Sequence, residues 1–234
     1  MKKSILSNPA FRYIFEIIVI VFSVTLSFYI QDVINKREKI YLKDKTLNGI
    51  LVDLQADKRA FKQASNVIYD RIRLIEDVLD GDINNEKIID LMTFWGFLGQ
   101  NSNYKSLIST GAIEYIETDG LTLRLSGYYE GGYTALNGES NSYNTLYLDL
   151  MSYMKKNYII NSMKKVEKGE GSGEFLKFIY STKELKKMEN DSELRNHFFE
   201  LKRIIHYYAT MFENGIERAN ALSNNIEREL LFRY

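Results

Sequence analysis

Cysteine is absent from this 234-residue sequence, and proline occurs once, at Pro9. The lack of cysteine excludes disulfides, thiolate metal sites and cysteine nucleophiles, and it fits a bacterial cytoplasm and a periplasm equally well. Proline interrupts helix interiors, so a chain with one proline and helical apolar spacing is predicted to fold from long helices. We therefore expect an all-α protein.

The sequence also has no net charge, because 31 Lys and Arg balance 31 Asp and Glu. No overall positive electrostatic potential therefore favours a nucleic-acid partner.

The two histidines, His197 and His206, are nine residues apart, which is about 900° on one helix. They therefore face opposite sides of the helix and cannot hold one metal together. The glycine-rich segment 127–133 follows no predicted strand and lacks the Lys-Ser/Thr ending of a phosphate loop. Without a recognisable nucleophile and base, we expect no enzyme activity, metal or cofactor.

An apolar run at 14–30 dominates the N-terminal part of the sequence. Its twelve strongly apolar residues each favour insertion by about 0.3–0.6 kcal/mol, which together outweigh the cost of Glu16 near one end. The run ends in bulky residues instead of the small ones that a signal peptidase requires. We predict a short basic tail at 1–12, an uncleaved transmembrane anchor at 13–34 and an extramembrane domain at 35–234.

Three polar residues inside this anchor are candidate contacts with a partner helix. Glu16 either meets a partner or an ion within the membrane, or reaches the headgroups and pairs with Arg12 four residues earlier. Ser23 and Ser27 form the small-xxx-small pattern that lets two spans pack closely, although serine pairs also arise by chance. Self-association through these serines is a hypothesis.

Helical spacing continues through most of the extramembrane domain. A stalk helix is predicted to extend from the anchor to residue 79 and to stop at Asp80-Gly81-Asp82. The last helix, 193–232, matches the stalk in length, which is typical of an elongated antiparallel bundle of three or four helices. Between them we predict helices at 85–98, at 104–116 with a break at Gly111, at 121–167 with a kink at Gly131-Gly132, and at 174–188, with a flexible linker at 168–173.

Lysines gather around this linker, among them Lys164, Lys165 and Lys168. If the stalk leads away from the bilayer and the helix at 121–167 returns, these lysines are candidate contacts with anionic headgroups. The alternative is a solvated tip, where interleaved glutamates balance the lysines.

Charges on both sides of the anchor leave its orientation open. Lys2, Lys3 and Arg12 precede it, while five basic residues between 36 and 45 follow it, and the larger count favours a cytoplasmic domain. A short basic tail before a first span usually stays inside, however, and long domains translocate regardless of charge. We expect the domain to lie in the periplasm.

Three groups of segments together resemble a known family. They are 12–19 with 33–37; 104–116 with Leu123-Arg124 and Tyr128-Tyr129; and 191–196 with 226–230. In order and spacing they are similar to the single-span helical membrane proteins of Bacteroidota grouped as domain of unknown function 6090. The chain departs from that family at Phe15, where the family has glycine before the glutamate. The resemblance implies a Gram-negative inner membrane and a helical outer domain, and it implies no activity.

These features predict a non-enzymatic, membrane-anchored protein that acts in assembly, scaffolding or sensing at the cell envelope. Its expected partners are the lipid bilayer and either further copies of itself or other membrane proteins. The alternative is an accessory subunit of an ion-driven or transport complex that uses Glu16 in the membrane.

Overall fold

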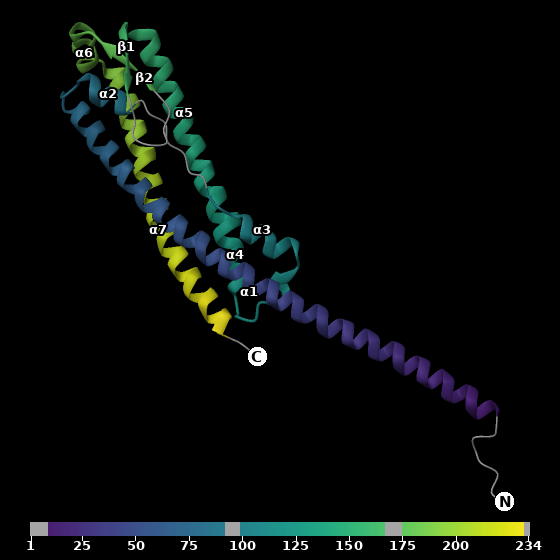
Figure 1. Ribbon diagram of the computed structural model, residues 1–234. Helices are drawn as coiled ribbons and strands as arrows, with labels where there is room; N and C mark the ends of the chain where they lie inside the picture. The colour runs from purple at the N-terminus through teal and green to yellow at the C-terminus, as the bar shows by residue number, and fades with distance from the viewer. Residues whose placement is uncertain (1–8, 92–98, 167–174, 232–234) are drawn as a thin grey trace, which may run out of the picture.

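The computed structural model describes residues 9–91, 99–166 and 175–231. The protein is all-α, as predicted, apart from one β-hairpin (Figure 1). Along the chain the elements are α1 (Pro9–Leu79), α2 (Asn85–Leu91), α3 (Ser102–Ser109), a 3₁₀ turn η2 (Ala112–Tyr115), α4 (Leu121–Ser126), a π-helical segment η3 (Gly127–Gly132), α5 (Tyr133–Asn157), β1 (Ile160–Val166), β2 (Phe175–Tyr180), α6 (Thr182–Glu189) and α7 (Ser192–Leu231).

A single helix, α1, carries the chain from the apolar segment into the bundle without a break, as predicted (Figure 1). Its 71 residues form a rod of roughly 105 Å, since each residue of a helix rises about 1.5 Å. The helix ends at Leu79. Just beyond it, Gly81 has a φ of 94°, a left-handed conformation that glycine adopts without strain, so the predicted stop signal is confirmed.

The N-terminal part of α1 projects from the bundle, and its side chains from Arg12 to Asp32 are all exposed. Within the described residues, it is the one segment long and apolar enough to cross a membrane. An apolar helix without protein around it is unfavourable in water, and a bilayer supplies the apolar surroundings that such a helix needs.

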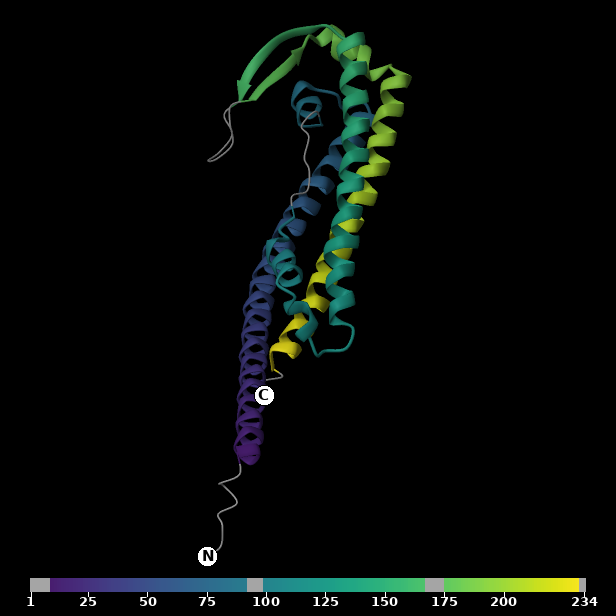
Figure 2. The ribbon, with the colours of Figure 1, turned by 90° about the vertical axis from the view of Figure 1, so that its right-hand side faces the viewer.

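The centre of the bundle is α7, which packs against both α1 and α5. α1 and α5 run in the same direction, and α7 returns antiparallel to both (Figures 1 and 2). Its buried positions recur every three, four or seven residues, so one stripe faces the neighbouring helices. Each large apolar side chain buried there contributes about 1.5–3 kcal/mol. The seam includes Phe198, Leu201, Ile205, Tyr208, Phe212 and Ile226.

Glycine interrupts the helices at both places where the sequence predicts a break or a kink. Gly111 has a φ of 69° and separates α3 from η2. The predicted kink at Gly131-Gly132 takes the form of η3, a π-helical segment between α4 and α5. Such segments bulge by one residue and occur often at functional sites. Here the bulge directs Tyr128 and Tyr129 into the core.

The predicted helix is wrong for residues 160–166 and 175–180, which pair as antiparallel strands with Met163 opposite Phe178. α5 ends at Asn157, and Tyr158 is already extended. β-branched residues at 159, 160 and 166 and the aromatic residues of β2 suit a strand. Short apolar runs in strands and in buried helices are similar, so periodicity alone does not separate them.

The end of the bundle opposite the apolar segment is closed by α2, α6 and the hairpin (Figures 1 and 2). Ile88, Ile89 and Leu91 of α2 are buried there, and α2 begins where the predicted helix at 85–98 begins. The rest of that helix, 92–98, and the linker at 168–173 lie outside the described residues.

Candidate functional site

A line of exposed residues runs along α1 from the apolar segment to the side of the bundle. This line, the outer face of α1, consists of Glu16, Ser23, Ser27, Ile34, Tyr41 and Val52. Successive members are four, seven or eleven residues apart, which is close to a whole number of turns and keeps them within about 40° of one another. The three anchor residues predicted as partner contacts therefore share one face with three apolar residues above the anchor.

The apolar members of the outer face are strongly exposed, by 52% at Ile34, 65% at Tyr41 and 64% at Val52. A single exposed apolar side chain is ordinary in a folded protein. Ile34 and Tyr41 are seven residues apart, and Val52 follows eleven residues later. Apolar residues at seven- or eleven-residue steps on one helix face are typical of a helix that pairs with another helix. The bundle leaves this face of α1 uncovered.

Within the anchor, the serine hydroxyls are satisfied by their own helix. Ser23 Oγ donates to the Val19 carbonyl over 2.7 Å, and Ser27 Oγ donates to the Ser23 carbonyl over 2.8 Å. Because these hydroxyls have acceptors, a lipid environment leaves them no unsatisfied donor. The short side chains still allow the backbone of a second helix to approach closely.

Glu16 lies near the start of the anchor with its side chain exposed. Among the described side chains, no ion pair joins it to Arg12, the partner that one prediction gave it. The sequence prediction of a partner contact at Glu16 stays a prediction.

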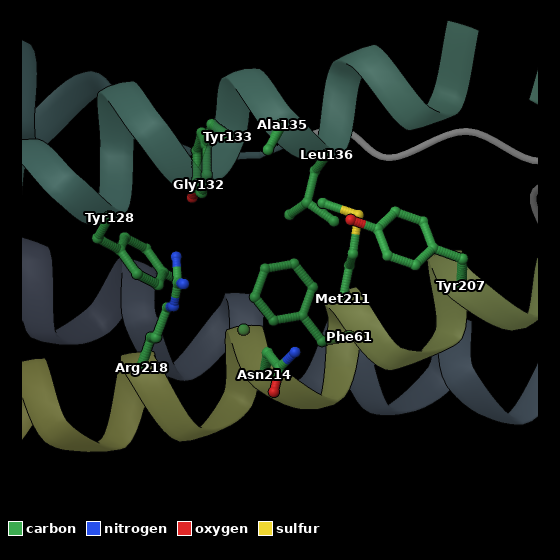
Figure 3. Close-up of a pocket in the computed structure, with 11 residues that line it drawn as sticks. Phe61, Tyr128, Gly132, Tyr133, Ala135, Leu136, Tyr207, Met211, Asn214 and Arg218 are labelled. Atoms are coloured by element: carbon green, nitrogen blue, oxygen red, sulfur yellow. The ribbon is translucent and has the colours of Figure 1, made fainter. Parts of the chain in front are cut away.

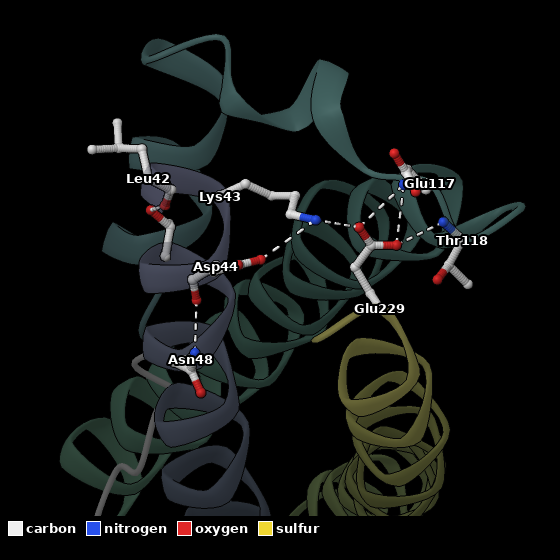
Figure 4. A network of polar contacts seen from close by, with 8 residues as sticks. Leu42, Lys43, Asp44, Asn48, Glu117, Thr118 and Glu229 are labelled. Atoms are coloured by element: carbon white, nitrogen blue, oxygen red, sulfur yellow. Dashed lines mark hydrogen bonds and ion pairs between the residues drawn. The ribbon is translucent and has the colours of Figure 1, made fainter. Parts of the chain in front are cut away.

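The base of the bundle, where α1 leaves it, contains a buried ion pair (Figure 4). Lys43 Nζ lies 2.6 Å from Glu229 Oε1, with the two side chains 2% and 0% exposed. The same carboxylate accepts the backbone N–H of Glu117 over 3.0 Å and that of Thr118 over 2.6 Å. Lys39, one turn earlier on α1, donates to the carbonyl of Thr110.

These contacts determine the charge of Glu229. Burial favours the neutral acid, but the hydrogen bonds from Lys43 and Thr118 outweigh it, so the pKa of Glu229 lies below its usual value. A charged carboxylate thus links α1, the loop before α4 and the end of α7. The base of the bundle is thereby fixed to the helix that carries the apolar segment.

A second buried carboxylate, Asp57, lies higher on α1 beneath η3. Tyr128 donates its hydroxyl to Asp57 Oδ2 over 2.9 Å, and Tyr133 donates to the same oxygen. Burial raises the pKa of Asp57, and these hydrogen bonds offset only part of that effect. Tyr128 and Tyr133 also line a cleft.

That cleft opens between η3, α5 and α7 and has a volume of about 250 Å³ (Figure 3). Phe61 from α1 forms its floor, and Leu136 and Met211 lie together on the side of the Phe61 ring toward Tyr207. A second cleft of about 230 Å³ adjoins it, and Tyr128 and Arg218 line both. The pair of clefts is a candidate binding site of small size.

The lysines predicted to contact headgroups lie elsewhere. The predicted return of 121–167 toward the bilayer is wrong, because α5 runs away from the apolar segment (Figures 1 and 2). Lys164 and Lys165 are exposed on β1 at the opposite end of the molecule, and Lys168 lies outside the described residues. The alternative of a solvated tip fits this position.

The histidines lie apart, as their spacing predicts. His197 is half-buried with its ring 4.9 Å from that of Tyr153, and His206 is exposed. No group of three or more His, Asp or Glu side chains in the described part of the chain is placed to hold a metal ion.

Sequence reasoning missed Lys43, Asp57, Arg218 and Glu229. A signal for three of them was present, since Lys43, Asp57 and Glu229 each occupy a position where the helical spacing of core residues requires an apolar side chain. A charged residue on a core stripe is rarely buried without a partner. The partners themselves are distant in sequence and could not be paired from spacing.

No family model, no curated protein and no solved structure matches this chain. The resemblance to the Bacteroidota family stays a prediction.

Proposed function

We propose that this chain is a non-enzymatic, single-span membrane protein that acts as a scaffold at the cell envelope, and that it does so as a parallel homodimer paired along α1. The observation that carries the proposal is the outer face of α1, on which small residues in the anchor and apolar residues above it lie in one line. Two copies inserted in the same orientation bring identical faces together around a two-fold axis.

The continuity of α1 supports a scaffolding role. Only about five residues, roughly 8 Å of helix, separate Ile34 at the end of the anchor from Lys39, the first contact with the bundle. From Lys39 to Leu79 the helix rises about 60 Å further. The base network fixes α1 to α7, so the anchor and the bundle move as one body. The hairpin, α2 and α6 are then presented roughly 70 Å from the bilayer.

The Gram-negative inner membrane and a periplasmic bundle belong to the same proposal. The cysteine-free chain allows a direct test. An impermeant maleimide applied to intact spheroplasts should label Ser152→Cys on the exposed side of α5 and leave Ser4→Cys unlabelled. Labelling of Ser4→Cys alone would place the bundle in the cytoplasm.

A second candidate role is that of an accessory subunit that uses Glu16. The exposure of Glu16 on the outer face of α1 supports this role. In that case the outer face meets a different membrane protein. Glu16→Gln should then abolish the activity of the complex while the amount of this chain in the membrane stays unchanged. In the scaffold, Glu16→Gln should leave pairing in place.

The dimer is tested by light scattering of the full chain in dodecyl maltoside. The wild type should have the mass of two chains, and the double variant Tyr41→Glu, Val52→Glu should have the mass of one. Like charges facing each other across an interface cost several kcal/mol. Leu148→Glu is the control, because Leu148 is 55% exposed on α5, away from the outer face. A monomeric wild type would contradict the proposal.

A further inference from the structure

The two adjoining clefts beside η3 share one cation. Arg218 of α7 lines both, and Arg124 of α4 lines the smaller one. Among the described residues, no acidic side chain lines either cleft and Arg218 forms no ion pair within 4.0 Å. An arginine beside an apolar cavity, without a carboxylate partner, is suited to bind an anionic group by two parallel hydrogen bonds.

The larger cleft has an apolar body and a polar end. Phe61, Leu136 and Met211 lie between Arg218 with Tyr128 at one end and Tyr207 at the other (Figure 3). The hydroxyls of Tyr128 and Tyr133 donate to Asp57, and both residues line the cleft. The shape therefore suits a molecule with one charged end and an apolar chain.

A glycine lies at the rim of the cleft. Gly132 of η3 lines it, and a Cβ added there would meet nothing closer than the Gly127 carbonyl at 3.7 Å. The missing side chain leaves space at the rim. A volume of about 250 Å³ is below the usual range of about 300–1,000 Å³ for sites that take drug-sized molecules, so the occupant is small.

We propose that this cleft binds a short-chain amphiphilic carboxylate, with the carboxylate on Arg218 and the alkyl chain over Phe61, Leu136 and Met211. The site does not depend on pairing of α1, since none of its residues belongs to the outer face. Either proposal can fail while the other stands. Binding here would make the scaffold responsive to a small anionic metabolite or to a free fatty acid.

The test uses hexanoate as the probe and the ε-methyl signal of Met211 as the reporter. The full chain in dodecyl maltoside is labelled with ¹³C-methyl methionine, and the signal is assigned with Met211→Leu. Hexanoate should shift the Met211 signal saturably and leave that of Met188, a buried residue of α6, in place. Hexanoate that merely partitions into the detergent micelle would not shift the Met211 signal alone. No shift at Met211 would overturn the proposal.

Two variants separate the charged end from the apolar body. Arg218→Gln should weaken hexanoate binding about ten-fold or more, because a hydrogen-bonded ion pair is lost, and should leave binding of hexan-1-ol within two-fold of the wild type. Gly132→Leu should weaken both by filling the rim. Arg203→Gln, on the same helix but paired with Glu200, is the control and should change neither. Equal affinity for hexanoate in Arg218→Gln and wild type would overturn the assignment.

Discussion

Lys43 and Glu229 lie 186 residues apart in sequence, and their charged atoms are 2.6 Å apart in the base of the bundle. Both side chains are buried, and Glu229 also accepts two backbone N–H groups from the loop before α4. The pair joins the start of the bundle on α1 to the end of α7. It therefore closes the bundle near the point where the apolar N-terminal part of α1 leaves it.

Replacing Glu229 with glutamine should destabilise the bundle by about 3 kcal/mol, the lower end of the range for a broken buried ion pair. The buried Lys43 ammonium then keeps only the partly exposed Asp44, 3.4 Å away, as a counter-charge. The glutamine amide still accepts the two backbone N–H groups, so the loss reports the ion pair. Urea unfolding of the full chain in dodecyl maltoside, followed by far-UV circular dichroism, measures the change.

The matched control for that substitution is Glu227→Gln, two residues away on the exposed side of α7. It should change the free energy of unfolding by no more than about 0.5 kcal/mol. Equal effects of the two substitutions would mean that the buried pair contributes nothing particular to stability.

Asp57 should make the stability of the bundle depend on pH in the opposite sense from a salt-bridged acid. Its pKa is raised in the folded chain, so between the unfolded and folded pKa values the folded state holds more protons. The free energy of unfolding then falls as pH rises through that window, by up to about 1.4 kcal/mol per pH unit.

Asp57→Asn removes this titration and keeps an oxygen that accepts the hydroxyls of Tyr128 and Tyr133. The stability of the wild type minus that of Asp57→Asn should therefore decrease from about pH 4 toward neutral pH. An increase of the Asp57 difference with pH would show that the carboxylate is stabilised in the folded state.

Replacing either of two helix glycines with alanine should change the stability of the protein, in opposite directions. Gly138 of α5 has open space where a Cβ would lie, so Gly138→Ala should stabilise the protein by about 0.5–1 kcal/mol. A Cβ at Gly215 of α7 would lie 2.9 Å from the ring of Phe61, which is buried. Overpacking there costs about 1–3 kcal/mol and exceeds the gain in helix propensity.

Thermal unfolding of the two variants in the same detergent compares them directly. The expected order of midpoints is Gly138→Ala, wild type, Gly215→Ala. A midpoint for Gly215→Ala above that of the wild type would show that the Phe61 ring moves without cost.

The long helices were predictable because their signals are local. The apolar spacing of α1 and α7, the stop at Gly81 and the breaks at Gly111 and near Gly131 all act within a few residues of the feature they cause. The hairpin was missed because strands and short buried helices share the same apolar spacing. The direction of α5 was missed because it depends on which helices pack together, which a single sequence does not state.

The residues of the candidate sites also divide into those that the sequence indicates and those that only the fold brings together. Glu16, Ser23 and Ser27 stand out in the sequence because polar residues are rare inside an apolar run. Their alignment with Ile34, Tyr41 and Val52 became visible only when α1 proved continuous and that face proved exposed. The clefts at Arg218 combine side chains from α1, η3, α5 and α7, so no stretch of sequence indicates them.

Disulfide cross-linking in native membranes tests the paired outer face of α1 most directly. Ile34→Cys lies on that face, and Lys36→Cys, two residues on, lies about 200° away around the helix. The chain has no other cysteine. Under mild oxidation Ile34→Cys should form a covalent dimer and Lys36→Cys should stay monomeric. Cross-linking at Lys36→Cys that equals or exceeds that at Ile34→Cys, or none at Ile34→Cys, would contradict pairing through this face.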